Sequence, residues 1–208
     1  MKLYLVRHGQ SIGNLNKRHQ HSDTPLSDLG RQQAQELAKR FSTIPIDIIL
    51  TSHFDRARET VEIVATGIDR TVEVNELLYE IKRPSEIEGM LNSDPLAVDI
   101  KDKIKANIHD PNWHYADEEN VFDLIARAKD FLTSLESRKE TSILAVSHGR
   151  IIEAIVGTVV LGDAITPLIF DQIKDSMYLS NTGITVLEKT NNLWHLITWN
   201  DNAHLGNI

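Results

Sequence analysis

The chain has 208 residues, contains no cysteine and carries a formal net charge of −8 at pH 7. The lack of cysteine excludes disulfides, thiolate nucleophiles and cysteine-based zinc sites, and the acidic balance argues against a nucleic-acid partner, which is bound through lysine and arginine. The amino-terminal apolar run is too short for a secretion signal, and no stretch approaches the roughly 18 apolar residues of a membrane helix. We therefore expect a cytoplasmic protein with no membrane partner, and the length favours a single domain over residues 1–208.

The first half of the chain alternates between strand and helix patterns. Residues 3–6 form an apolar run, which predicts a buried strand. Ser27 is a helix N-cap, and apolar side chains at helical spacing predict an amphipathic helix over residues 29–41. Residues 46–50 are mostly apolar and β-branched and form the second expected strand. A second amphipathic face follows over residues 57–64.

The second half repeats this alternation. Apolar spacing predicts a long helix over residues 121–135, a buried strand over 143–146 and a buried helix over 151–161. Residues 184–199 are expected to close the fold as a hairpin with a turn near Asn191. Strands that alternate with helices in this way predict an α/β fold, with a mostly parallel central sheet and helices on both faces.

The segment from about residue 80 to 118 breaks the pattern. Its periodicity is weak, and it contains Pro84, Pro95 and Pro111 together with several asparagines and aspartates. These residues interrupt regular structure. We expect a small, irregular helical cap inserted over one end of the sheet.

Three of the apolar runs end in polar clusters that carry arginine or histidine. The clusters are Arg7-His8-Gly9, residues 51–56 and Ser147-His148-Gly149. If the runs are parallel strands, their carboxyl ends share one edge of the sheet, which is where open α/β sheets bind ligands. Two arginines, two histidines and nearby helix N-termini at that edge predict an anion site, best matched by phosphate.

The residue types in these clusters suit phosphoryl transfer. A neutral imidazole such as that of His8 can attack phosphorus and form a covalent intermediate. The guanidinium groups of Arg7 and Arg56 can bind the equatorial oxygens in a planar fork. His8 and His148 are each followed by glycine, which we interpret as room for close approach of the ligand.

The motifs, taken in order, resemble the histidine phosphatase superfamily, in its phosphoglycerate mutase-like branch. The resemblance spans roughly residues 3 to 187. The matching segments are Arg7-His8-Gly9-Gln10-Ser11 with Asn14, Thr24-Pro25-Leu26-Ser27 with Leu29-Gly30, Arg56-Ala57 with Thr60, Leu77-Leu78-Tyr79-Glu80, Ser147-His148-Gly149 and Asn181-Thr182-Gly183-Ile184.

The resemblance implies a role for each matching residue. His8 is the nucleophile, and Glu80 protonates the leaving oxygen and later deprotonates the attacking water. The phosphate pocket and substrate contacts are assigned to Arg7, Ser11, Asn14, Arg56, His148 and Gly149. The resemblance implies neither a metal nor another cofactor, because arginines and a protonated histidine supply the electrostatic stabilisation.

Some of these residues have a second interpretation. Glu80 competes as the acid with the nearby glutamates at positions 76, 86 and 88. Asn14 fits a loop-capping role as well as a phosphate contact. Arg56 is favoured over Arg58, because Arg58 is spaced to pair with a glutamate four residues further on.

The basic residues of loop 15–23 and the pair Lys82-Arg83 also fit two roles. They either bind a second anionic group of the substrate or form a solvated basic surface. The loop residues in question are Lys17, Arg18, His19 and His21. The histidines of this loop have no carboxylate or histidine at a spacing typical of metal ligands, so no metal site is predicted there.

The sequence departs from the mutase pattern at several points. Gly13 stands where mutases commonly carry tryptophan, Ser52-His53-Phe54 replaces the usual Ser-Pro, and residues 82–85 replace an aromatic-glycine pair. We therefore predict a phosphoric monoester hydrolase that acts on a small phosphorylated metabolite, without a metal, through phosphorylated His8, and releases inorganic phosphate. The alternatives are a phosphoglycerate mutase and a non-catalytic phospho-ligand-binding protein.

Overall fold

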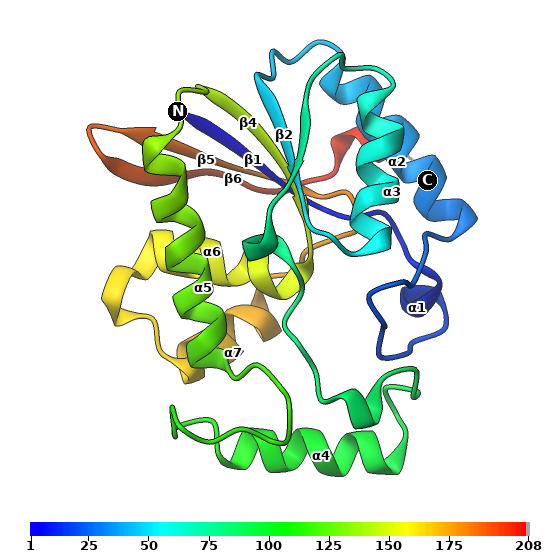
Figure 1. The fold of residues 1–208 in the computed structure, drawn as a ribbon, viewed down its shortest axis with the longest axis vertical. Coiled ribbons are helices and arrows are strands. Elements are labelled where there is room, and N and C mark those ends of the chain that lie inside the picture. Colours follow the sequence, from blue (N-terminus) through cyan, green and yellow to red (C-terminus); the bar gives the residue numbers. More distant parts are fainter. Residues whose placement is uncertain (207–208) are drawn as a thin grey trace.

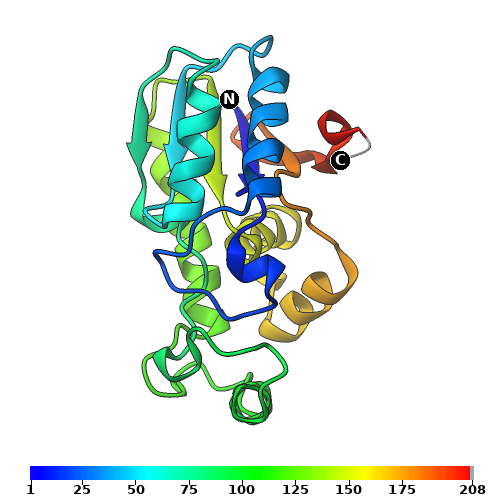
Figure 2. The same cartoon turned by 90° about the vertical axis from the view of Figure 1, so that its right-hand side faces the viewer.

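Four parallel strands and a carboxyl-terminal antiparallel hairpin form one sheet in the order β3-β2-β4-β1-β5-β6. The computed structural model describes residues 1–206. The strands are β1 (Lys2–Arg7), β2 (Ile48–Thr51), β3 (Val72–Val74), β4 (Ser142–Ser147), β5 (Ile184–Thr190) and β6 (Leu193–Asp201). Figure 2 shows the parallel strands pointing toward the cap at the lower end of the molecule.

Helices cover both faces of this sheet (Figure 1). α2 (Asp28–Phe41) and α3 (Asp55–Ala65) pack on one face, and α5 (Val121–Ser134) and α6 (Gly149–Leu161) pack on the other. The helix α7 (Pro167–Ser176) packs against α6. The mostly parallel α/β fold predicted from the sequence is confirmed.

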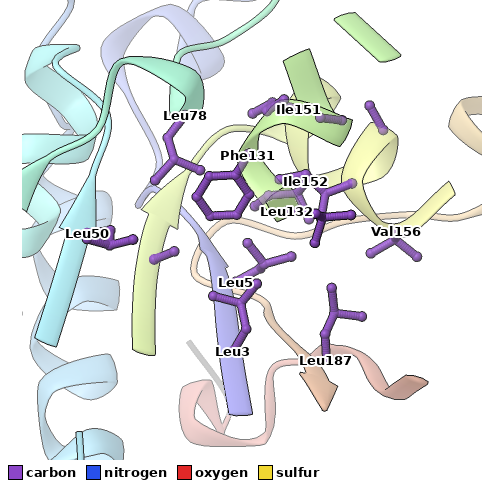
Figure 3. Close-up of a cluster of buried hydrophobic side chains, with 14 of the residues drawn as sticks. Leu3, Leu5, Leu50, Leu78, Phe131, Leu132, Ile151, Ile152, Val156 and Leu187 are labelled. Atoms are coloured by element: carbon purple, nitrogen blue, oxygen red, sulfur yellow. The ribbon is translucent and has the colours of Figure 1, made fainter. Parts of the chain in front are cut away.

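The two faces have separate cores because side chains alternate along each strand. On β1, Leu3 and Leu5 point into the α5–α6 core, whereas Val6 points into the α2–α3 core. Figure 3 shows Phe131 and Ile152 packed over Leu5 in the larger core. Burial of each such large apolar side chain stabilises the fold by about 1.5–3 kcal/mol.

The start of α2 and the turn between β5 and β6 lie where the sequence predicted them, because local side-chain signals specify both. The Ser27 hydroxyl accepts a hydrogen bond from the Gly30 amide at 3.1 Å, which caps α2. Asn191 and Asn192 have φ angles of 51° and 64°. Asparagine tolerates this left-handed conformation, which a tight hairpin turn needs. The closing hairpin is therefore confirmed.

The elements that escaped prediction include α1 (Ile12–Leu15), β3 and α7. The helix α1 has four residues, and β3 has three residues with partly exposed side chains, so neither shows a periodic pattern. α7 begins at Pro167 behind an N-cap threonine, which is an ordinary start signal. The strand β2 begins at Ile48 rather than at residue 46, although Ile46 is still buried.

The cap lies beyond the end of the sheet at which the parallel strands finish (Figures 1 and 2). It contains the 3₁₀ turn η2 (Ser85–Ile87), the helix α4 (Pro95–Ala106) and a small core around Ile87, Ala97 and Ile100. Loop 15–23 is bonded to the cap through its backbone. The His19 amide donates to the Met90 carbonyl, and the Gly89 amide donates to the His19 carbonyl, both at 2.9 Å.

The single-domain boundary at residues 1–208 stays a prediction, and residues 207–208 lie outside the described part of the chain. Within residues 1–206, no helix combines the length and the apolar character that crossing a bilayer requires.

Candidate active site

The three polar clusters meet because the strands that carry them are neighbours in register. Arg7 at the end of β1 pairs with Ser147 at the end of β4, and Thr51 at the end of β2 pairs with Val146. A cavity of about 630 Å³ opens in front of these strand ends. Arg7, His8, Arg56 and Glu80 all line it. The predicted convergence of these residues is therefore what the structure shows.

His8 is buried, with 2% of its surface exposed, and its ring is held in one orientation. Its Nδ1 lies 2.7 Å from the Gly9 carbonyl oxygen, which can only accept a hydrogen bond, so Nδ1 carries the proton. Arg56 Nε donates to His8 Nε2 at 3.3 Å, so Nε2 presents its lone pair. Burial, followed by the charges of Arg56 and Arg7, lowers the pKa of His8 well below its ordinary value. The imidazole is therefore neutral, with its proton on Nδ1 and its lone pair on Nε2.

Gly9 serves chain packing rather than ligand access. A Cβ atom at this position would lie 2.5 Å from the carbonyl oxygen of Gly30, a residue of α2. The Gly9 amide donates to the Thr60 hydroxyl at 3.1 Å, which ties the loop to α3 as well. The sequence predicted that a ligand approaches closely at Gly9, but the close neighbour in the structure is the backbone of Gly30. At Gly149 a Cβ atom would meet Glu80 and Arg7 at 3.8 and 3.9 Å, so this glycine faces the site.

The two arginines are anchored and keep donors for a ligand. Arg7 donates from one terminal nitrogen to the Leu179 carbonyl at 2.6 Å, while its buried Nε has no hydrogen-bond partner within residues 1–206. Arg56 is 2% exposed and donates to the His21 carbonyl at 3.0 Å. Burial lowers the pKa of Arg56 to about 10, so it stays charged at neutral pH. Arg58 is exposed, in agreement with the preference for Arg56.

His148 is fully buried beside His8, with 5.1 Å between the two ring centroids. Its Nε2 lies 2.8 Å from the Ser52 hydroxyl, and its buried Nδ1 has no partner among the described residues. Burial, then the charge of Arg56, lowers the pKa of His148 well below its ordinary value. The free protein therefore holds this ring neutral, unlike the protonated histidine that the resemblance implies. A dianionic phosphate beside the ring would favour the protonated form.

Glu80 lies beside the N-terminus of α6, which begins at Gly149. Its Oε1 accepts hydrogen bonds from the Ile81 amide at 2.9 Å and from the Arg150 amide at 3.1 Å. Glu80 and Arg7 both border Gly149, since a Cβ atom there would lie 3.8 Å from Glu80 Oε2 and 3.9 Å from Arg7 Nε. Of the competing glutamates, Glu88 also lines the cavity but bonds His21 at 2.8 Å, whereas the carboxylate of Glu76 bonds His53 at the same distance.

Ser11 and Asn14 form the cap of α1. The Ser11 hydroxyl accepts from the Asn14 amide at 3.0 Å and donates to the Gln20 side chain at 2.6 Å. It is fully buried and, like His148, lies behind the residues that line the cavity, so its predicted contact with phosphate stays a prediction. Asn14 Oδ1 accepts from the Ser11 amide, yet Asn14 lines the cavity. Asn14 therefore combines the two roles considered for it: it caps the loop and faces the ligand space.

Arg127 holds the segment that carries Glu80, and sequence reasoning missed it. Its guanidinium donates to the carbonyls of Leu77 and Tyr79 at 2.9 and 2.7 Å, and it forms a bidentate ion pair with Glu119. Both side chains of the ion pair are 8% exposed. The available signal was a charged residue on the face of the predicted helix 121–135 that otherwise carries apolar side chains.

Asn181 was matched by motif without a role, and the structure supplies one. Its Nδ2 donates to the His8 carbonyl at 3.0 Å and to Asn14 Oδ1 at 3.3 Å. The side chain thus links the backbone of His8 to the loop that follows it. Two aromatic residues, Phe54 and Tyr79, also line the cavity and were not predicted as site residues.

The cavity is strongly basic in a chain of net charge −8. Its cationic lining residues are Arg7, Lys17, Arg18, Arg56, Lys82, Arg83 and Arg150, against the carboxylates of Glu80 and Glu88. Such a local excess attracts an anionic ligand against the overall field. Within residues 1–206, no three histidine, aspartate or glutamate side chains converge as a metal site would require.

The sheet thus brings two histidines, the buried Arg56 and the partly buried Arg7 to its strand ends, an arrangement suited to binding a phosphate group. The family model of the histidine phosphatase superfamily (branch 1) matches residues 3–202, and the chain belongs to this superfamily. A probable phosphatase from Schizosaccharomyces pombe is 30% identical over 99% of this chain and 95% of its own. A probable phosphoglycerate mutase from Proteus mirabilis is 28% identical over 100% of this chain and 96% of its own.

Solved structures give the same picture. YhfR of Bacillus stearothermophilus superimposes with a TM-score of 0.84 at 28% identity, covering 98% of both chains. A phosphoserine phosphatase from Entamoeba histolytica, in complex with 3-phosphoglyceric acid, superimposes with a TM-score of 0.79 at 27% identity, again covering 98% of both chains.

Proposed function

We propose that the protein is a metal-independent phosphatase that hydrolyses a small phosphate monoester through a phosphohistidine at His8. The observation that carries this proposal is the fixed tautomer of His8, whose Nε2 lone pair lies beside Arg56 in a basic cavity. The S. pombe relative, named a probable phosphatase, and the E. histolytica phosphoserine phosphatase support the reaction class.

In the first step, Arg56 Nε turns its hydrogen bond from His8 Nε2 to a phosphoryl oxygen, which frees the Nε2 lone pair. His8 Nε2 then attacks phosphorus and the ester P–O bond breaks. Glu80, in its carboxylic acid form, donates its proton to the departing oxygen. Arg7 and Arg56 stabilise the charge that spreads over the equatorial oxygens. The unpartnered Nδ1 of His148 supplies a further donor once phosphate binding favours protonation of that ring.

In the second step, water attacks the phosphorus of the phosphohistidine. Glu80, now a carboxylate, accepts a proton from that water as the N–P bond breaks. Inorganic phosphate leaves, and His8 returns to the neutral form with its proton on Nδ1. The proposed catalytic set thus comprises Arg7, His8, Arg56, Glu80 and His148. Asn14 and Gly149 are proposed to contact the substrate.

A phosphoglycerate mutase is the second candidate, favoured by the name of the P. mirabilis relative. In that reaction the phosphohistidine returns its phosphoryl group to the other hydroxyl of the glycerate instead of passing it to water. Formation of 2-phosphoglycerate from 3-phosphoglycerate, faster than phosphate release, would select this alternative.

We further propose that the protein is cytoplasmic and acts there on a small phosphorylated metabolite.

The test is hydrolysis of p-nitrophenyl phosphate with EDTA present. Wild type, His8→Ala and the control His195→Ala, which removes an exposed histidine of β6, are compared. We expect wild type and His195→Ala to be equally active and His8→Ala to lose at least about 10³-fold in kcat. Activity that disappears with EDTA, or that survives in His8→Ala, contradicts the proposal.

A further inference from the structure

The guanidinium of Arg83 faces the cavity without a protein partner. The other cavity cations, apart from Lys17, have one: Arg7 bonds Leu179, Arg18 bonds Gly89, Arg56 bonds His21, Lys82 pairs with Asp117 and Arg150 pairs with Glu153. Within residues 1–206, neither Arg83 nor Lys17 makes a side-chain hydrogen bond or ion pair, so these two are left to water or to a ligand.

Lys17 and Arg83 differ in their access to water. Lys17 is exposed on loop 15–23, so water solvates its charge and nothing further is required. Arg83 is partly buried, and burial lowers its pKa even though the charge of Glu80 acts in the opposite direction. A desolvated charge is costly unless it is paired. The unpaired guanidinium in a ligand cavity therefore indicates an anionic group that belongs to the substrate.

His19 supplies a second unpartnered polar group in the same cavity. Its buried Nε2 has no hydrogen-bond partner among the described residues, and its backbone is fixed by the bonds to Met90 and Gly89. Burial and the nearby charges of Arg83 and Lys101 lower the pKa of His19 to about 4. The ring is neutral at pH 7, and in the tautomer protonated on Nε2 it can donate to an anion.

The position of Arg83 places this second anion on the leaving group. Arg83 follows the proposed acid Glu80 by three residues and lines the cavity together with Glu80 and Arg150. Arg7 and Arg56, by contrast, surround the His8 nucleophile. The transferred phosphoryl group therefore belongs at His8, and the rest of the substrate extends past Glu80 toward the cap.

We propose that Arg83, with His19 beside it, binds a second anionic group of the substrate, either a carboxylate or a phosphate. The substrate class is then a phosphate monoester whose leaving group is itself an anion. This inference rests on the proposed phosphatase function. Lys82 is not part of the subsite, because Asp117 already neutralises it at 3.1 Å.

Two pairs of esters test the inference by kcat/KM. 3-Phosphoglycerate is compared with glycerol 3-phosphate, which lacks the carboxylate, and fructose 1,6-bisphosphate with fructose 6-phosphate, which lacks the second phosphate. In wild type we expect a preference of about tenfold or more for the anionic member of one pair. The pair with the larger preference identifies the anion as carboxylate or phosphate.

Three variants assign that preference to Arg83. Arg83→Gln should lower kcat/KM for the preferred anionic ester by about tenfold to a hundredfold and change its partner by less than about threefold. Arg83→Lys should recover part of the preference. Lys105→Gln removes an exposed cation of α4 outside the cavity and should keep the full preference. No preference in wild type, or an equal loss for both members in Arg83→Gln, overturns the inference.

Binding to the His8→Ala protein separates this inference from the phosphatase proposal. Calorimetric titration with the same four esters measures the subsite without turnover, so it decides even if no ester is hydrolysed. We expect the anionic member of one pair to bind about tenfold or more tightly, and Arg83→Gln to abolish the difference. Equal affinities within both pairs overturn the inference, whereas p-nitrophenyl phosphate hydrolysis independently decides the reaction class.

Discussion

The strand-end side of the cavity and its cap side differ in how far protein contacts already satisfy their polar groups. At the strand ends, His8, Arg56 and His148 are buried, and each ring or guanidinium is oriented by at least one protein hydrogen bond. On the cap side, Arg83 has no partner, and Lys17 is exposed. The proposed phosphoryl site is thus already ordered by protein contacts, whereas the proposed leaving-group side keeps a cation without a protein partner among residues 1–206.

The largest effect on stability is expected at the link between the two sides. Arg127→Met removes the guanidinium that holds residues 77–79 and leaves the Glu119 carboxylate buried without its ion-pair partner. We expect a loss of about 3–5 kcal/mol in the free energy of unfolding, measured by urea denaturation. Lys129→Met on the same helix breaks only a surface pair with Asp163 and should cost less than about 1 kcal/mol. Equal losses would contradict the anchoring role of Arg127.

Arg56→Ala tests the preformed side directly. It removes both the donor to His8 Nε2 and a proposed phosphate ligand, so kcat/KM for p-nitrophenyl phosphate should fall by about 10²–10³-fold. The matched change Arg58→Ala, at an exposed position two residues further along α3 and on its opposite face, should leave kcat/KM within about twofold of wild type. Similar effects of the two substitutions would show that Arg56 does not act at the site.

The neutral histidines of the strand-end side predict a particular pH dependence of stability. The folded-state pKa of His148 lies well below 6.5, so the unfolded chain binds more protons as pH falls below that value. Stability from this group is complete above pH 6.5 and declines toward acid by at most about 1.4 kcal/mol per pH unit. His148→Gln should therefore flatten the decline between pH 6.5 and 5.5 in urea denaturation.

Glu153 acts in the opposite direction in the same pH window. Burial raises its pKa to about 7, so its folded form holds a proton that the unfolded chain loses as pH rises. The comparison of wild type with His148→Gln cancels this contribution, since Glu153 is present in both. A slope unchanged by His148→Gln would contradict the neutral state of the buried ring.

The smallest effect is expected for Lys82→Gln on the cap side. Lys82 lines the cavity, but its ammonium group pairs with Asp117 and is half-exposed. Pairs of this kind contribute about 0–1 kcal/mol. We expect kcat/KM for an ester with a second anion to change by less than about threefold. A loss as large as that of Arg83→Gln would assign both cations to the subsite.

The strand-end side could be predicted from the sequence because its signals are local. Each apolar run of β1, β2 and β4 ends in a polar cluster, and parallel strands bring such clusters to one edge. Arg56 could be chosen over Arg58 because the spacing to Thr60 puts it on the inner face of α3. The structure confirms both the sheet and the meeting of these residues.

The rest depended on contacts between segments far apart in the chain. Arg127 bonds carbonyls 50 and 48 residues away, and no local pattern specifies that. Gly9 was interpreted as room for a ligand, although the neighbour it avoids is the backbone of Gly30. The cap gave weak signals because its few buried side chains form only a small core, so the partners of Lys82 and Arg83 could not be distinguished.

The most direct measurement is to trap the covalent intermediate. Rapid acid-free quenching of wild type with a ³²P-labelled ester, followed by peptide mapping, locates the transferred phosphoryl group. The mechanism predicts one acid-labile, base-stable label on the peptide that contains His8, formed before phosphate is released and absent from His8→Ala. Label on another residue, or steady turnover by His8→Ala, would contradict the central claim that His8 is the nucleophile.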